Sequence, residues 1–238
     1  MLEKLGVNII RAYDLVAGTF ASKHRIPSIP LLISVHDVNP ERVPLDNPEA
    51  NGFLSLSQAV RNFLLNRGVS AKLIHDFANR VDEGIFFPFG DTRARNAFRK
   101  QFPCKHILVH VGRKTEQKNL DTVIKSLRYL EDFCAIFIGQ GNEDKYKALA
   151  AREQVLERCV FIKSVKNEDL AQFYNYCDVM CTPSRWEGFG IVFIEALACA
   201  AVVVSSDKEP MNEYIKNMEN GILVKNYENP YALSRAIY

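Results

Sequence analysis

Between residues 105 and 224, short apolar runs alternate with segments of helical periodicity, and this alternation limits the folds that the chain can adopt. From Leu120 to Leu130, for example, apolar residues recur at the i, i+3, i+4, i+7 spacing of one helix face. Apolar strands separated by helices predict an α/β fold with a parallel sheet covered by helices on both faces. The predicted strands are Ile107–Val111, Ala135–Ile138, Val160–Ile162, Val179–Cys181, Val202–Ser205 and Ile222–Val224.

The N-terminal part of the chain predicts a smaller α/β unit. Residues 1–35 have the pattern helix, strand, helix, strand, with Leu31–Val35 as the clearest strand. Prolines over 40–52 predict an irregular loop. The next predicted strand is Phe53–Leu56, and Ser57 is placed to cap the helix that follows it.

A basic stretch separates the two predicted units. It spans residues 87–104 and includes Arg93, Arg95, Arg99 and Lys100. Its weak apolar stripe favours a solvated connecting helix, and a phosphate-binding or membrane-facing helix is the alternative. We therefore predict two Rossmann-like α/β lobes, a partial one over 1–86 and a second one over 87–238.

Composition and charge exclude several classes of protein. The chain has 238 residues and a net charge of +2, which gives no strong preference for nucleic acid. No run reaches the ~18 apolar residues of a membrane span, and the N-terminus has no signal-peptide core. The six cysteines include no CxxC pair, and most lie in apolar strand-like runs. We predict six reduced, unpaired cysteines, no metal site and a cytoplasmic protein, with peripheral membrane contact as an open possibility.

Three loops that follow predicted strands carry chemically notable residues, and in a parallel sheet all three fall on one edge. The first, residues 112–119, places Arg113 and Lys118 between a strand and a helix start, as phosphate-clamping cations would be. For this loop taken alone, two solvated surface cations are the alternative. The second, Gly139–Asn142, is a glycine-rich turn, and most such turns only supply positive φ.

The third loop, Pro183–Glu195, is the most specific. The strand-like run Val179–Cys181 leads into it and a helix-like run leads out, so free N–H groups and the helix dipole form an anion site. Two internal glycines allow a ligand to approach the backbone closely. Glu187 and Glu195 bracket the turn, and an acid in the first turns of a helix is suited to sugar hydroxyls. The alternative is a helix N-terminus with incidental acids.

A longer set of residues agrees with these loops in chain order. The set comprises Asn79–Asp82 with Phe86 and Pro88, Gly112-Arg113 with Lys118-Asn119, Gly139–Gly141, Val160-Phe161, Asp178-Val179, Pro183-Ser184, Glu187–Gly190, Glu195–Ala198, Glu213 and Asn220–Val224. Over about residues 79–238 the chain resembles the C-terminal donor-binding domain of GT-B fold glycosyltransferases, in particular the large retaining group often called family 4. The E-x7-E spacing with an internal Gly-Phe-Gly is the specific part of this resemblance. The first 80 residues resemble the latter half of the partner acceptor domain.

The resemblance implies a role for each matching residue. Arg113 and Lys118 would hold the diphosphate of the donor and offset charge on the leaving group. Glu187 would contact the donor sugar, and Glu195 would accept hydrogen bonds from ribose hydroxyls. His36 follows a strand near where such enzymes often place a cleft histidine, and a loop histidine that caps a strand end is the alternative. The other implied donor-binding positions are Gly112, Gly139, Gly141 and the backbone amides of Gly188, Phe189, Gly190 and Ile191.

The resemblance also implies an activity. A retaining hexosyltransferase of this kind takes a nucleotide-diphosphate-sugar as donor and a glycan, lipid-linked or other glycoconjugate as acceptor, with no cofactor, usually no metal and no nucleic acid. Such enzymes usually have the acceptor attack on the face that the nucleotide leaves, with the phosphate helping to remove its proton.

The chain departs from the family pattern in ways that predict truncation. The first lobe lacks the usual opening strand and glycine-rich loop, and the chain stops at Tyr238, early in a helix, so the second lobe lacks its final helices. Ala200 and Lys208-Glu209 stand where the family often has glycines. One alternative function is a non-catalytic truncated remnant that binds nucleotide or a partner. Another is a nucleotide-sugar epimerase of the same double-Rossmann shape, which the E-x7-E signature disfavours.

Overall fold

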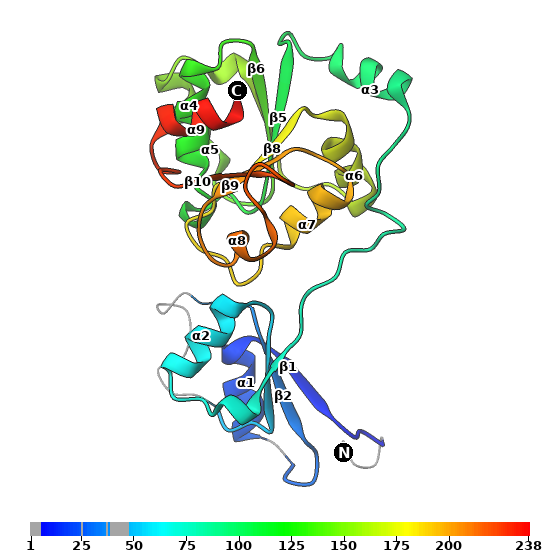
Figure 1. Cartoon of the computed structure of the whole chain (residues 1–238), viewed down its shortest axis with the longest axis vertical. Helices are drawn as coiled ribbons and strands as arrows, with labels where there is room; N and C mark the ends of the chain where they lie inside the picture. Colours follow the sequence, from blue (N-terminus) through cyan, green and yellow to red (C-terminus); the bar gives the residue numbers. More distant parts are fainter. Residues whose placement is uncertain (1–5, 25, 37, 39–47) are drawn as a thin grey trace. The chain divides into compact units, whose positions relative to one another are not determined.

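The computed structural model describes residues 6–24, 26–36, 38 and 48–238, and the chain divides into two compact units. The first unit is Met1–Asn79 together with Trp186–Phe189, and the second is Arg80–Arg185 together with Gly190–Tyr238. The division therefore falls next to Asn79, a few residues before the predicted lobe boundary. Figure 1 shows that each unit is built on its own sheet.

The first unit contains a four-stranded parallel sheet in the order β1-β2-β3-β4. Its elements are β1 (Ile10–Tyr13), α1 (Asp14–Lys23), β2 (Leu31–Val35), β3 (Gly52–Ser55), α2 (Gln58–Asn66), η2 (Ala71–Leu73) and β4 (Ile74–Asp76). Ser57 caps α2 as predicted, because its Oγ accepts a hydrogen bond from the backbone N–H of Val60 at 3.2 Å. The start of the predicted N-terminal helix and most of the predicted 40–52 loop lie outside the described residues.

The second unit contains a six-stranded parallel sheet in the order β10-β9-β8-β5-β6-β7. Its strands are β5 (His106–Val111), β6 (Phe133–Ile138), β7 (Cys159–Ile162), β8 (Val179–Cys181), β9 (Val203–Ser206) and β10 (Ile222–Val224), which confirms the predicted strands to within two residues. The chain runs outward from β5 through β7, returns to pair β8 with β5, and continues in the opposite direction to β10. The strand order therefore reverses between β5 and β8, and such a reversal is where open α/β sheets bind ligands.

Helices cover both faces of this second sheet, as the sequence predicted. They are α3 (Thr92–Arg99), η3 (Glu116–Lys118), α4 (Leu120–Ser126), η4 (Leu127–Tyr129), α5 (Glu143–Arg152), η5 (Leu156–Arg158), α6 (Asn167–Tyr176), α7 (Ile191–Ala198), α8 (Met211–Tyr214) and α9 (Pro230–Ile237). One apolar core joins α4, α5 and α9 to the sheet, and a second joins α6, α7 and α8 to the other face (Figure 1). Among the described residues, every helix is too short or too polar to cross a bilayer.

The basic helix α3 is tied to the second unit by ion pairs. Arg99 Nη1 lies 2.7 Å from the Asp178 carboxylate, and Arg95 Nη2 lies 3.3 Å from it. The same carboxylate accepts a hydrogen bond from the backbone N–H of Ile107 at 2.8 Å. These two arginines thus anchor a helix that has no buried residue, in agreement with the solvated connecting helix that the sequence favoured.

The prediction of six unpaired cysteines is wrong, because Cys104 and Cys134 form a disulfide with a Cα–Cα distance of 5.5 Å. The pairing of β5 with β6 explains this bond: Ile107 is the register partner of Cys134, so the residues just before β5 run beside the start of β6. The remaining cysteines, Cys159, Cys177, Cys181 and Cys199, are free. The two cysteines are far apart in sequence and lie together only through strand register, which sequence spacing does not reveal.

Candidate functional site

The loops that follow β5 and β8 meet at the point where the strand order reverses. The backbone N–H of Arg185 donates a hydrogen bond to the carbonyl of Gln117 at 2.8 Å. The side-chain amide of Asn119 donates to the carbonyl of Pro183 at 3.0 Å. The structure therefore brings together the first and third loops that the sequence singled out, although they are far apart in the chain.

The glycine-rich turn after β6 packs directly on the loop after β5. Gly139 has φ +141, and a Cβ atom there would lie 2.0 Å from the carbonyl oxygen of Gly112. Gly141 has φ +140, and its Cβ would lie 2.5 Å from the carbonyl oxygen of Lys114. Both positions require glycine, because φ is positive and because a Cβ atom would collide with the backbone of the β5 loop. This turn therefore supplies positive φ and also packs against the β5 loop at the carboxyl ends of the strands.

The two predicted phosphate-binding cations differ in exposure. Lys118 is 8% exposed, and its aliphatic stem lies over Gly112, where an added Cβ would be 2.9 Å from Lys118 Cε. Arg113 is exposed, and its Nη2 lies 3.5 Å from the Gln117 side-chain oxygen. The alternative of two solvated surface cations therefore fails for Lys118.

Lys114 is a structural cation that the sequence interpretation passed over. Its ammonium donates hydrogen bonds to the carbonyls of Gly139 and Ile162, the latter at 2.8 Å. It also forms an ion pair with Glu143 at 3.1 Å. Burial lowers the pKa of Lys114, while Glu143 opposes that shift. Lys114 thereby ties the ends of β6 and β7 to the β5 loop. The sequence did not indicate which of the three neighbouring cations, Arg113, Lys114 and Lys118, makes these contacts.

His110 on β5 makes a hydrogen bond to the loop that follows this strand. Its Nε2 lies 3.0 Å from the carbonyl oxygen of Lys118, so the neutral ring donates a hydrogen bond there. Nδ1 is buried and has no hydrogen-bond partner among the described residues. Burial lowers the pKa of His110 to about 4.

We expect this histidine to make the fold sensitive to acid. Because the pKa falls from 6.5 in the unfolded chain to about 4 in the fold, the unfolded state binds the proton first as the pH drops. The free energy of unfolding should therefore decrease by roughly 3 kcal/mol between pH 6.5 and pH 4 on account of His110 alone. Urea unfolding of His110→Gln, which keeps a donor to Lys118, should show a pH dependence smaller by about that amount. His75→Gln removes an exposed imidazole and serves as the control; an equal change in both variants would contradict the assignment.

Helix α7 begins directly at the third loop. Gly190 precedes it with φ +82, and no described side chain caps its first turn. Its free N–H groups are thus available to an anion. Glu195 lies one turn into the helix and is 9% exposed; its Oε2 accepts a hydrogen bond from Tyr174 at 3.2 Å. Burial raises the pKa of Glu195, and the Tyr174 hydrogen bond opposes this shift.

Four predicted site residues belong to the first unit. They are His36 and three residues of the third loop, Glu187, Gly188 and Phe189. Within that unit a Cβ on Gly188 would lie 2.0 Å from the His36 carbonyl oxygen, and Ser57 Oγ donates to the Gly188 carbonyl at 2.6 Å. Burial lowers the pKa of His36, while Asp14 opposes this shift. The remaining predicted residues, namely Gly112, Arg113, Lys118, Gly139, Gly141, Gly190, Ile191 and Glu195, lie in the second unit.

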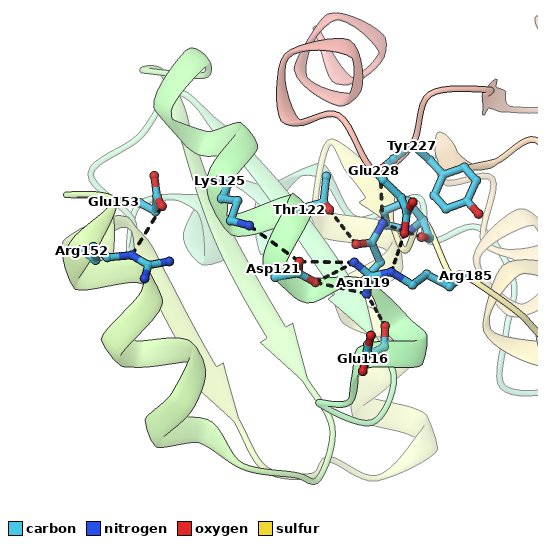
Figure 2. Close-up of polar contacts among 11 residues, drawn as sticks. Glu116, Asn119, Asp121, Thr122, Lys125, Arg152, Glu153, Arg185, Tyr227 and Glu228 are labelled. Atoms are coloured by element: carbon cyan, nitrogen blue, oxygen red, sulfur yellow. Dashed lines mark hydrogen bonds and ion pairs between the residues drawn. The ribbon is translucent and has the colours of Figure 1, made fainter. Parts of the chain in front are cut away.

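A pocket of about 620 Å³ opens beside α4 and α5, and none of the predicted site residues lines it. Figure 2 shows that two of its lining cations are paired with acids, Lys125 with Asp121 and Arg152 with Glu153 just outside the pocket. The distances are 3.8 Å and 3.9 Å. These pairs reduce the charge that the pocket offers to a ligand. The strand-order reversal, with its buried lysine and open helix N-terminus, is the better candidate site.

Comparison with known proteins matches a family model to the C-terminal part of the chain. The family described as "Glycosyl transferases group 1" matches residues 93–238. The D-inositol 3-phosphate glycosyltransferase of Mycolicibacterium gilvum is 28% identical over 154 residues, which are 62% of this chain and 35% of that protein. The match thus spans about a third of the length of that relative.

Solved structures show the same fold at low sequence identity. Sucrose-phosphate synthase of Thermosynechococcus elongatus has a TM-score of 0.85 at 20% identity, over 99% of this chain and 65% of that chain. The Anabaena protein Alr3699/HepE, solved in complex with UDP-glucose, has a TM-score of 0.85 at 23% identity, over 97% of this chain and 68% of that chain.

Proposed function

Because the chain belongs to the glycosyl transferases group 1 family, we propose that it transfers a sugar from a nucleoside-diphosphate-sugar donor to a glycan, lipid-linked or other glycoconjugate acceptor, with retention of configuration. Its two parallel α/β units are those of the GT-B fold. One observation carries the proposal: the β5 and β8 loops meet where the strand order reverses, the first loop carries a buried lysine, and an uncapped helix N-terminus follows the second.

In this proposal the donor diphosphate is held by Lys118, Arg113 and the first-turn amides of α7. The cations and the helix dipole offset the charge that develops on the leaving nucleoside diphosphate. The structural relative HepE is described with UDP-glucose, which supports a donor of this chemical class.

The two acids of the third loop take different parts of the donor. Glu195 lies one turn into α7, so its side chain reaches a ribose when the phosphates sit at the helix N-terminus. One of its oxygens accepts from Tyr174, and an ionised carboxylate has further acceptor positions for ribose hydroxyls. Glu187 precedes the glycines and contacts the sugar that lies beyond the phosphates.

Glutamine substitutions test these roles. We expect Glu195→Gln to weaken both UDP or GDP and the matching nucleotide-sugar by about tenfold to a hundredfold, because a hydrogen bond to a charged acceptor contributes ~1.5–3 kcal/mol. We expect Glu187→Gln to spare the bare nucleotide and to weaken only the sugar-bearing donor and turnover. Calorimetric titration of UDP and GDP beside their sugar conjugates measures both effects.

Glu219→Gln, which changes an exposed acid of the second unit, is the matched control for these titrations. Equal loss of the bare nucleotide in both loop variants would show that the two acids form one structural unit. Failure of the unaltered chain to bind either nucleotide would overturn the proposed function. Binding without sugar transfer would instead favour a nucleotide-binding protein without catalysis.

A further inference from the structure

We infer that Arg185 is a positioning residue of the donor site, which holds the turn that carries Lys118 in place. The inference rests on the proposed function, because it assigns Lys118 to the donor diphosphate. The sequence includes Arg185 in the specific third loop but gives it no role, since nothing in the linear pattern shows what its side chain contacts.

Arg185 contacts both the turn that contains Lys118 and the first turn of the helix that follows it. Its backbone N–H donates to the Gln117 carbonyl at 2.8 Å, and its Nη1 donates to the Glu116 carbonyl. Both terminal nitrogens lie 3.3 Å from Asp121 Oδ1, at the start of α4. Figure 2 shows the guanidinium directed toward Glu116 and Asp121. The single turn η3 is therefore fixed by contacts to its first two residues and to the helix after it.

The same guanidinium also contacts the loop that follows β10. Its Nε donates to Glu228 Oε1 at 2.7 Å, in the segment between β10 and α9. Asn119 reinforces this junction, because its side-chain amide donates to the carbonyls of Pro183 at 3.0 Å and Tyr227 at 3.2 Å. Loops that follow β5, β8 and β10 are thus joined at one point, next to the turn that contains Lys118.

These contacts make Arg185 a supporting group for the phosphate-binding cation. All three guanidinium nitrogens have protein acceptors, and the side chain is only 18% exposed. A planar fork with several fixed donors suits this arrangement, and a lysine ammonium cannot reproduce it. The carbonyl of Lys118 itself accepts a hydrogen bond from His110 at 3.0 Å. The turn that contains Lys118 is therefore held both by a β5 side chain and by the β8 loop.

The test compares the nucleotide affinity of the whole chain with and without the Arg185 guanidinium. Whichever of UDP and GDP binds, and its nucleoside, are titrated into the unaltered chain, Arg185→Gln and Arg185→Lys. We expect Arg185→Gln to weaken the diphosphate about tenfold, since small displacements of a binding group have large effects, and to change nucleoside affinity less than about twofold. Arg185→Lys should lie between, because it keeps the charge but loses the fork. Arg128→Gln, which removes an exposed arginine that pairs with Glu153, is the control.

A double-mutant cycle decides whether Arg185 acts through Lys118. In a Lys118→Met background, adding Arg185→Gln should cost less than about twofold further affinity. An additive loss, or a nucleoside loss as large as the diphosphate loss, would overturn the inference while leaving the donor site intact. Unchanged diphosphate affinity in Arg185→Gln would overturn it as well. If the unaltered chain binds neither nucleotide, the proposed function fails and the inference fails with it. Thermal unfolding verifies that each variant is folded. If Arg185→Gln does not fold, Arg185→Lys replaces it in the titrations and in the double-mutant cycle.

Discussion

Replacing Lys118 by methionine is expected to weaken the binding of UDP or GDP about tenfold to a hundredfold. Methionine retains an unbranched stem over Gly112 but removes the ammonium, and a hydrogen bond to a charged group contributes ~1.5–3 kcal/mol. Arg113→Ala should act in the same direction and toward the lower end of that range, because Arg113 is exposed and its charge is better screened. Calorimetric titration measures both effects.

Lys147→Ala is the control for these titrations, since it removes an exposed cation of the same unit that pairs with Glu143. If Lys118→Met and Arg113→Ala both bind nucleotide as the unaltered chain does, these cations are not phosphate ligands. If Lys118→Ala loses affinity and Lys118→Met does not, packing of the lysine stem is responsible and its charge is not.

Replacing Gly139 by alanine is expected to destabilise the second unit by roughly 2–6 kcal/mol. The new Cβ would lie 2.0 Å from the Gly112 carbonyl oxygen and 2.6 Å from its carbon, both of them backbone atoms that cannot rotate away. A φ of +141 adds strain for any residue with a side chain. Urea unfolding of the variant measures the loss.

Gly90→Ala is the matched control, because no heavy atom lies within 4 Å of a Cβ at that position. A Gly139→Ala variant as stable as Gly90→Ala would show that the β5 and β6 loops do not approach each other so closely. Reduced nucleotide binding without reduced stability would assign Gly139 to the ligand surface and not to the packing of the two loops.

Local signals in the sequence predicted much of the fold. Apolar runs marked each strand of the second unit to within two residues, because a strand buried on both faces must be apolar along its length. Ser57 was recognised as a helix cap from its place before an amphipathic segment. Ala200, which stands where the family often has glycine, indeed has a positive φ of 55°. These features depend on residues close together in the chain.

Features that depend on distant residues were not accessible in the same way. The Cys104–Cys134 bond follows from strand register, and the inward turn of Lys114 depends on carbonyls at the ends of two other strands. The grouping of Trp186–Phe189 with the first unit depends on contacts across the whole chain. Sequence alone placed Arg113 and Lys118 on one loop, but it did not show that one is buried and the other exposed.

The strand order of the second sheet has a consequence for synthesis on the ribosome. Strands β5, β6 and β7 are consecutive and can pair as they emerge, whereas β8, which completes the other edge of β5, is made only after Ile162 and the whole of α6. Until then one side of the apolar strand His106–Val111 has no partner from the second sheet. An unpaired apolar edge readily pairs with other chains. A nascent chain from which β5 to β7 have emerged and β8 has not should therefore need a chaperone to remain unaggregated.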